Sequence, residues 1–163
     1  MLIRDATEAD LPGVLAIYND AVRTSTAVYT EELDTLEGRR RWFEARAAAG
    51  FPVLAAVEAA SVLGFASFGD FRPWPGYKHT VEHSVYVAEA ARGQGIGPAL
   101  VSALLPRAGA LGKHMMIAGI DAANETSIRM HERLGFERAG VLREVGRKFE
   151  RWLDLLLMQR LLP

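Results

Sequence analysis

One stretch decides the fold: Ser84-Val85-Tyr86-Val87 and, after four intervening residues, Arg92-Gly93-Gln94-Gly95-Ile96-Gly97. The first segment is typical of a strand, and apolar residues at helical spacing continue after Pro98. This order predicts a strand, a glycine-rich turn and a helix whose first backbone N–H groups are free. Free N–H groups and the helix dipole both favour a phosphate or pyrophosphate, and glycine lets the backbone approach it.

The glycine spacing indicates which phosphorylated group is bound. Gly93, Gly95 and Gly97 follow GxGxG and not the dinucleotide pattern GxGxxG, and Pro98 stands where a P-loop needs lysine. Arg92-x-x-Gly95-x-Gly97 resembles the acetyl-CoA pyrophosphate loop of the GNAT family of N-acetyltransferases. The resemblance implies that acetyl-CoA contacts Val85, Tyr86, Val87, Arg92, Gly93, Gln94, Gly95, Ile96, Gly97 and Pro98. The alternative is a plain connection between strand and helix.

Composition limits the remaining classes. The 163 residues predict one domain, residues 1–163, and half of them are hydrophobic. A net charge of −1 gives no attraction to nucleic acid or to an anionic membrane, so neither partner is expected. The chain has no cysteine, which excludes a cysteine acyl-enzyme and fits a reducing cytoplasm. The N-terminal residues lack the apolar core of a signal peptide, and we expect a cytoplasmic protein.

The pattern along the chain predicts an α/β fold. Leu2–Arg4 reads as a strand, and helices follow from about Pro12 and over Thr35–Ala49, the second with Trp42, Phe43 and Ala47 inward. We expect Arg39-Arg40-Arg41 on a solvated face of that helix. The later elements are a hairpin over residues 53–58 and 62–68, strands over 80–87 and 115–120, helices over 97–110 and 124–135, and closing strands over 136–144 and 152–161. This order indicates a mixed central sheet with helices on both sides, and it agrees with the topology of the GNAT family.

A second block supports the resemblance. Residues 124–136, from Asn124 to Gly135-Phe136, resemble the GNAT segment after the second cofactor-binding strand. The resemblance implies that Asn124 contacts the pantetheine arm, although asparagine is also a favoured helix N-cap. Many GNAT enzymes place a tyrosine seven residues later as general acid for the CoA thiolate. His131 stands there, and it is our candidate acid or a structural histidine.

The strand Thr80–Val87 resembles that of phosphinothricin and methionine sulfoximine acetyltransferases. Glu82, Ser84 and Tyr86 share one face of the strand, and His83 and Val85 share the other. An ammonium has no lone pair, so an amine must lose a proton before it attacks a thioester. Glu82 is the candidate general base, directly or through water, with His83 as the alternative and a paired structural carboxylate as the plain interpretation. His79 and His83 lack a third ligand, and no metal is expected.

The loop of residues 71–77 is the candidate substrate site. Arg72 offers a planar fork of donors for a substrate carboxylate, and Trp74 and Tyr77 would form walls. An exposed loop arginine is the alternative. The predicted substrate-binding residues are Arg72, Pro73, Trp74, Tyr77, Glu82, His83 and Ser84, with Val28 and Tyr29 as weaker candidates.

The resemblance implies direct acetyl transfer from acetyl-CoA to the α-amino group of a small amino acid or analogue, such as phosphinothricin, methionine sulfoximine or methionine sulfone. It also implies a homodimer. The alternatives are acetylation of a protein N-terminus or a polyamine, and a non-catalytic module that senses acyl-CoA.

Overall fold

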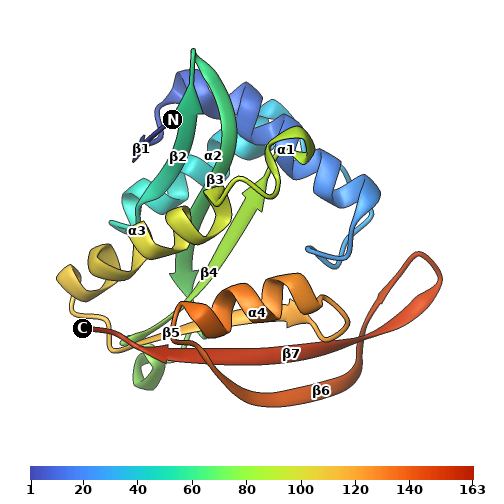
Figure 1. Cartoon of the computed structure of the whole chain (residues 1–163). Coiled ribbons are helices and arrows are strands. Elements are labelled where there is room, and N and C mark those ends of the chain that lie inside the picture. Colours follow the sequence, from blue (N-terminus) through green and yellow to red (C-terminus); the bar gives the residue numbers. More distant parts are fainter.

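The computed structural model describes residues 1–163, and its elements follow the predicted order (Figure 1). The strands are β1 (Leu2–Asp5), β2 (Val53–Glu58), β3 (Ser61–Asp70), β4 (Thr80–Val87), β5 (Met115–Asp121), β6 (Glu137–Lys148) and β7 (Arg151–Leu161). The helices are α1 (Leu11–Thr24), α2 (Leu36–Ala48), α3 (Ile96–Ala110) and α4 (Glu125–Arg133). None of these helices is both long and apolar enough to cross a membrane.

The strands form one mixed sheet in the order β1-β2-β3-β4-β5-β7-β6. All neighbouring pairs are antiparallel except β4 and β5, which are parallel. A parallel pair needs a crossover, and α3 supplies it between these two strands. The α/β prediction is therefore confirmed.

Helices cover both faces of the sheet. Leu100 and Leu104 of α3 and Ile128 of α4 belong to the main core, which also contains Phe68 and Met116 of the sheet. On the other face, Val14 and Ile17 of α1 pack against Phe65 of β3, and Trp42 of α2 lies against the same cluster. The site described below lies where the sheet opens between these two layers.

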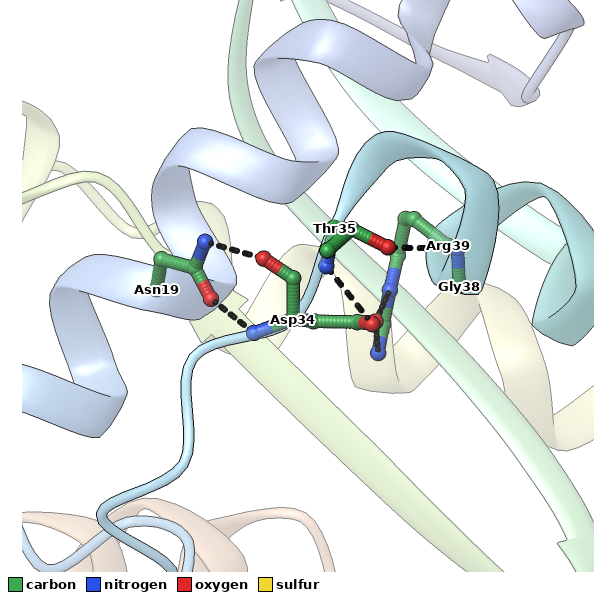
Figure 2. A network of polar contacts seen from close by, with 5 residues as sticks. All are labelled: Asn19, Asp34, Thr35, Gly38 and Arg39. Carbon is green, nitrogen blue, oxygen red and sulfur yellow. Dashed lines mark hydrogen bonds and ion pairs between the residues drawn. The ribbon is translucent and has the colours of Figure 1, made fainter.

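The prediction for α2 is wrong in two respects. Ala47 is exposed, and Arg39, which we expected on a solvated face, is only 7% exposed. Figure 2 shows the reason: Nε and Nη2 of Arg39 both donate to Asp34, at 2.9 and 2.6 Å. The guanidinium also stacks on Tyr18 and Trp42, 4.1 and 4.6 Å from their ring centroids. A charge paired and stacked in this way can leave water, whereas Arg40 and Arg41 pair only with exposed Glu37.

The closing strands also differ from the prediction. The first was expected to end at Glu144, but β6 continues to Lys148 and turns at Phe149 and Glu150, both with positive φ. The pairing with β7 shifts register between Leu142 and Gly146, which marks a bulge. β7 lies between β5 and β6, so the end of the chain is inserted inside the sheet. This long hairpin reaches the loop that follows α1.

Candidate active site

The sheet opens between β4 and β5. β4 pairs with β3 from Val81 to Val87 but with β5 only from Thr80 to Glu82. Beyond Glu82 the two strands run apart (Figure 1), and the edge of residues 83–87 that faces β5 has no strand partner. Unpaired backbone groups inside a fold need a partner, so this edge can accept an extended ligand as an additional strand.

A pocket of about 180 Å³ occupies this opening. The predicted site residues that line it are Glu82, His83, Ser84, Val85, Tyr86, Asn124 and His131. The lining residues that sequence reasoning missed are Ala27, Ala118, Gly119, Ile120, Asp121 and Ser127. The resemblance of residues 124–136 to the segment after a second cofactor-binding strand pointed only toward those on β5.

Of the two carboxylates that line the pocket, Glu82 has no hydrogen-bond partner. The other one, Asp121, accepts hydrogen bonds from the Thr26 hydroxyl and from Ala123 N. Glu82 accepts none, and a Cβ on Gly119 would lie only 3.0 Å from its Oε1, so glycine leaves room for the carboxylate. Burial raises the pKa of Glu82, which makes its carboxylate a better proton acceptor.

His83 and His131 meet on the opposite face of the sheet. Their Nε2 atoms are 3.0 Å apart, and their rings stack with centroids 5.1 Å apart. Phe136 packs against both rings. Burial lowers the pKa of both side chains, that of His83 to about 3, so both are neutral at pH 7.

The hydrogen bonds fix the tautomers of this neutral pair. Nδ1 of His131 lies 2.7 Å from the carbonyl oxygen of Ser127, which can only accept, so Nδ1 carries the proton. Nε2 of His131 is then an acceptor, and Nε2 of His83 donates to it. Nδ1 of His83 is left as a buried acceptor without a partner. The acid role of His131 stays a prediction, and it requires that Nε2 first take up a proton and release His83.

The glycine-rich turn has the predicted form. Gly93 and Gly95 have φ of 77° and 78°, and Gly95 is the N-cap of α3. The backbone N–H groups of residues 93–97 donate no hydrogen bond outside the helix ladder, and Arg92 is exposed beside them. These are free donors at a helix N-terminus, which fit a pyrophosphate.

Asn124 begins α4 at the far side of the pocket. Its Oδ1 accepts a hydrogen bond from Ser127 N at 3.1 Å, so the N-cap interpretation is confirmed. Asn124 borders the pocket, and its side-chain amide N–H groups donate none of the hydrogen bonds in the structure. They can serve a ligand in the opening while Oδ1 caps the helix.

The loop with Arg72 does not line the pocket. Arg72, Pro73, Trp74 and Tyr77 are exposed, Trp74 by 62%. The Arg72 guanidinium lies over the rings of Phe71 and Tyr77, 5.4 and 5.9 Å from their centroids. The role of this loop in substrate binding therefore stays a prediction.

The loop after α1 reaches the pocket through Ala27 and not through Val28 or Tyr29. The Tyr29 hydroxyl donates to Asp154 O at 3.0 Å, and burial raises the pKa of Tyr29 to about 12. Lys148, 1% exposed, donates to Ser25 O and Val28 O at 2.6 and 2.9 Å. The tip of the β6–β7 hairpin thus holds one wall of the pocket.

A glycine-capped helix start, an opened pair of parallel strands and an unpartnered carboxylate between them define an acyltransferase of the acetyl-CoA-binding type. Residues 14–136 match the acetyltransferase (GNAT) family model, and the chain belongs to this family.

Three relatives are similar over nearly the whole chain. An L-methionine sulfoximine/L-methionine sulfone acetyltransferase of Pseudomonas paraeruginosa is 55% identical over 96% of this chain and 92% of its own. The crystal structure of a ribosomal-protein-alanine N-acetyltransferase from Brucella melitensis is 53% identical, with a TM-score of 0.98 over 99% of this chain and 100% of that one. An acetyltransferase of Salmonella typhimurium, solved with its cofactor acetyl-CoA, is 45% identical, with a TM-score of 0.97 over 99% and 94% of the two chains.

Proposed function

We propose that this chain, acting as one domain, transfers the acetyl group of acetyl-CoA to the α-amino group of a small amino acid or analogue. Methionine sulfoximine, methionine sulfone and phosphinothricin are the proposed acceptors. The observation that carries the proposal is the unpartnered Glu82 carboxylate in the sheet opening, in a chain whose α3 begins with the free N–H groups of residues 93–97. The similarity to the Pseudomonas enzyme supports the substrate class.

The chain's own groups fit acetyl-CoA. The N–H groups of residues 93–97 would hold the pyrophosphate, with Arg92 as a nearby positive charge. The free edge of Val85 and Val87 and the Asn124 amide would hold the pantetheine arm. When bound, acetyl-CoA supplies the thioester whose acetyl carbon is attacked.

Glu82 prepares the acceptor amine. It takes a proton from the ammonium, and the nitrogen lone pair then attacks the acetyl carbon as the C–S bond breaks. The amide nitrogen loses a second proton, and the departing thiolate gains one. With no cysteine in the chain we propose direct attack within a ternary complex, so initial-rate plots should intersect, whereas parallel lines would indicate an acetylated enzyme.

CoA release with a panel of amines tests this function. The panel contains methionine sulfone, phosphinothricin, a polyamine and a peptide with N-terminal alanine, the last because of the name of the Brucella relative. We expect release with the amino-acid analogues. Preference for the peptide or the polyamine would reject the substrate class, and no release with any amine would favour a sensor of acyl-CoA.

Glu82→Gln tests the base. We expect kcat to fall by about 10²–10⁴-fold while calorimetry shows unchanged acetyl-CoA binding. Glu44→Gln, at an exposed position of α2, is the matched control. A Glu82→Gln variant that keeps its kcat would move the base role to His83.

We further propose a cytoplasmic homodimer. β6 is an edge strand, and Val141, Leu142 and Val145 on it and Trp152 on β7 are exposed. Exposed apolar side chains on a sheet edge favour pairing with another chain. Light scattering that gives the mass of one chain would reject the dimer, and recovery of the protein outside the cytoplasmic fraction would reject the location.

A further inference from the structure

The side chain of Arg46 is half-buried, lies 5.7 Å from the ring centroid of Trp42, and has a buried Nε without a hydrogen-bond acceptor. Arg46 belongs to α2 and lies on β3 at Gly69, where an added Cβ would collide with it. Its side chain takes part in no hydrogen bond and no ion pair, and its Nε is fully buried. Burial lowers the pKa of Arg46, while Asp70 is the acidic group that favours its charged form. Buried donors are nearly always satisfied in folded proteins, so this one indicates an acceptor that arrives from outside.

The strand register brings Arg46 to the sheet face of Glu82. Gly69 on β3 is the direct partner of Glu82 on β4, and opposite residues of an antiparallel pair point to the same face. The Glu82 carboxylate leans the other way, toward Gly119 of β5. Neighbouring strands are about 4.8 Å apart, so the guanidinium and the carboxylate are separated by roughly two strand spacings, about 10 Å.

This separation fits a zwitterionic amino acid. Its amine nitrogen and carboxylate oxygens lie on the order of 3 Å apart, and a hydrogen bond of about 2.9 Å at each end gives a span of roughly 9 Å. The charged groups that line the pocket are the carboxylates of Glu82 and Asp121, and no lysine or arginine lines it. An acceptor with its ammonium at Glu82 therefore finds no cation in the pocket wall for its carboxylate. Arg46 lies over Gly69 of β3, the residue paired with Glu82 on the neighbouring strand.

We propose that Arg46 binds the α-carboxylate of the acceptor amino acid and sets the distance at which its amine meets Glu82. The inference rests on the proposed function, because it requires an amino-acid acceptor. The planar fork of a guanidinium matches a carboxylate in two parallel hydrogen bonds. Arg46 would thus be the group that distinguishes an amino acid from a simple amine.

Two acceptors that differ only in the carboxylate test this role. KM and kcat are measured for methionine sulfone and for the amine left by its decarboxylation. For Arg46→Met we expect KM for methionine sulfone to rise about 10- to 100-fold, the loss of a charged hydrogen-bonded pair. KM for the decarboxylated amine and the calorimetric Kd for acetyl-CoA should not change. Arg41→Met, at an exposed position of the same helix, is the matched control.

Arg46→Lys keeps the charge and most of the packing, and it serves if Arg46→Met does not fold. We expect it to raise KM for methionine sulfone alone, by less than Arg46→Met does. Equal effects on both acceptors, or none on either, would overturn the proposal. The proposal would also be overturned if Arg72→Met raised KM for the amino acid and Arg46→Met did not. If the wild-type enzyme acetylates no amino acid, the proposed function itself is rejected. This outcome is distinct from a failure of the proposed role of Arg46.

Discussion

The Nε2 atoms of His83 and His131 lie 3.0 Å apart, although these residues are 48 positions apart in the sequence. Both rings are neutral at pH 7 because burial lowers their pKa values, that of His83 to about 3. An exposed histidine has a pKa of about 6.5. The pair therefore links the β4 strand to α4 in a way that depends on pH.

Stability should fall as the pH drops from 7 to 5. In this window the unfolded chain takes up protons at His83 and His131 more readily than the folded chain does, because burial lowers both pKa values in the folded state, so protons favour the unfolded state. One histidine with a folded pKa near 3 accounts for a loss of about 2 kcal/mol in the free energy of unfolding. Asp10, with its pKa lowered to about 2, reduces the free energy of unfolding only at lower pH. Urea titrations at both pH values measure the loss.

A double variant, His83→Leu with His131→Leu, isolates the cause. Its free energy of unfolding should change much less between pH 7 and pH 5 than that of the wild type. The exposed His79 supplies the control, and His79→Gln should keep the wild-type dependence. An unchanged pH dependence in the double variant would show that other groups cause the loss.

The order of elements could be predicted from the sequence because its signals are local. The glycine turn at Gly93–Gly97 and the Asn124 cap act within a few residues, and both took the expected form. The insertion of β7 between β5 and β6 depends on pairing between segments far apart, and no local pattern encodes it.

The same limit applies to the site. The face shared by Glu82, Ser84 and Tyr86 follows from strand alternation, and all three line the pocket. The contact of His83 with His131 and the approach of Lys148 to Ser25 join distant segments, so the sequence alone did not reveal them. Arg39 was assigned to solvent because a run of three arginines does not show which one meets Asp34.

Arg39→Ala should destabilise the fold by about 3 kcal/mol. Removing Arg39 takes away the cation that pairs with the partly buried Asp34 and leaves that carboxylate with only the Thr35 N–H as a donor (Figure 2). Arg40→Ala, one residue further along α2, should change the free energy of unfolding by no more than about 0.5 kcal/mol because Arg40 is paired only with exposed Glu37. Urea denaturation measures both. Similar losses in the two variants would contradict the structural role of Arg39.

Lys148→Met should loosen the wall of the pocket. It leaves the carbonyl groups of Ser25 and Val28 without their donor, which costs about 2 kcal/mol of stability. Ala27, between those two residues, borders the pocket, so we expect a higher KM for the acceptor. The affinity for acetyl-CoA should persist because the residues proposed to hold the pyrophosphate, 93–97, do not line the pocket that Ala27 borders. Steady-state kinetics and calorimetry separate the two effects.

Lys78→Met is the control for this variant, since Lys78 is exposed and its side chain donates no hydrogen bond. It should behave as wild type in both measurements. A Lys148→Met enzyme with reduced stability but unchanged KM would show that the hairpin tip stabilises the fold without shaping the acceptor site.

Gly95 and Gly112 allow a matched test of the cofactor loop. They stand at opposite ends of α3, with φ of 78° and 70°, and an added Cβ would meet nothing within 4 Å at either position. Valine at a positive φ is strained, so Gly95→Val and Gly112→Val should each lose roughly 1–2 kcal/mol of stability.

Only Gly95→Val puts a β-branched side chain beside the free N–H groups proposed to hold the pyrophosphate. Calorimetry should therefore show acetyl-CoA binding weakened by at least about 10-fold, or 1.4 kcal/mol, in Gly95→Val and unchanged in Gly112→Val. If the folded Gly95→Val protein binds acetyl-CoA as tightly as the wild type does, the pyrophosphate lies elsewhere.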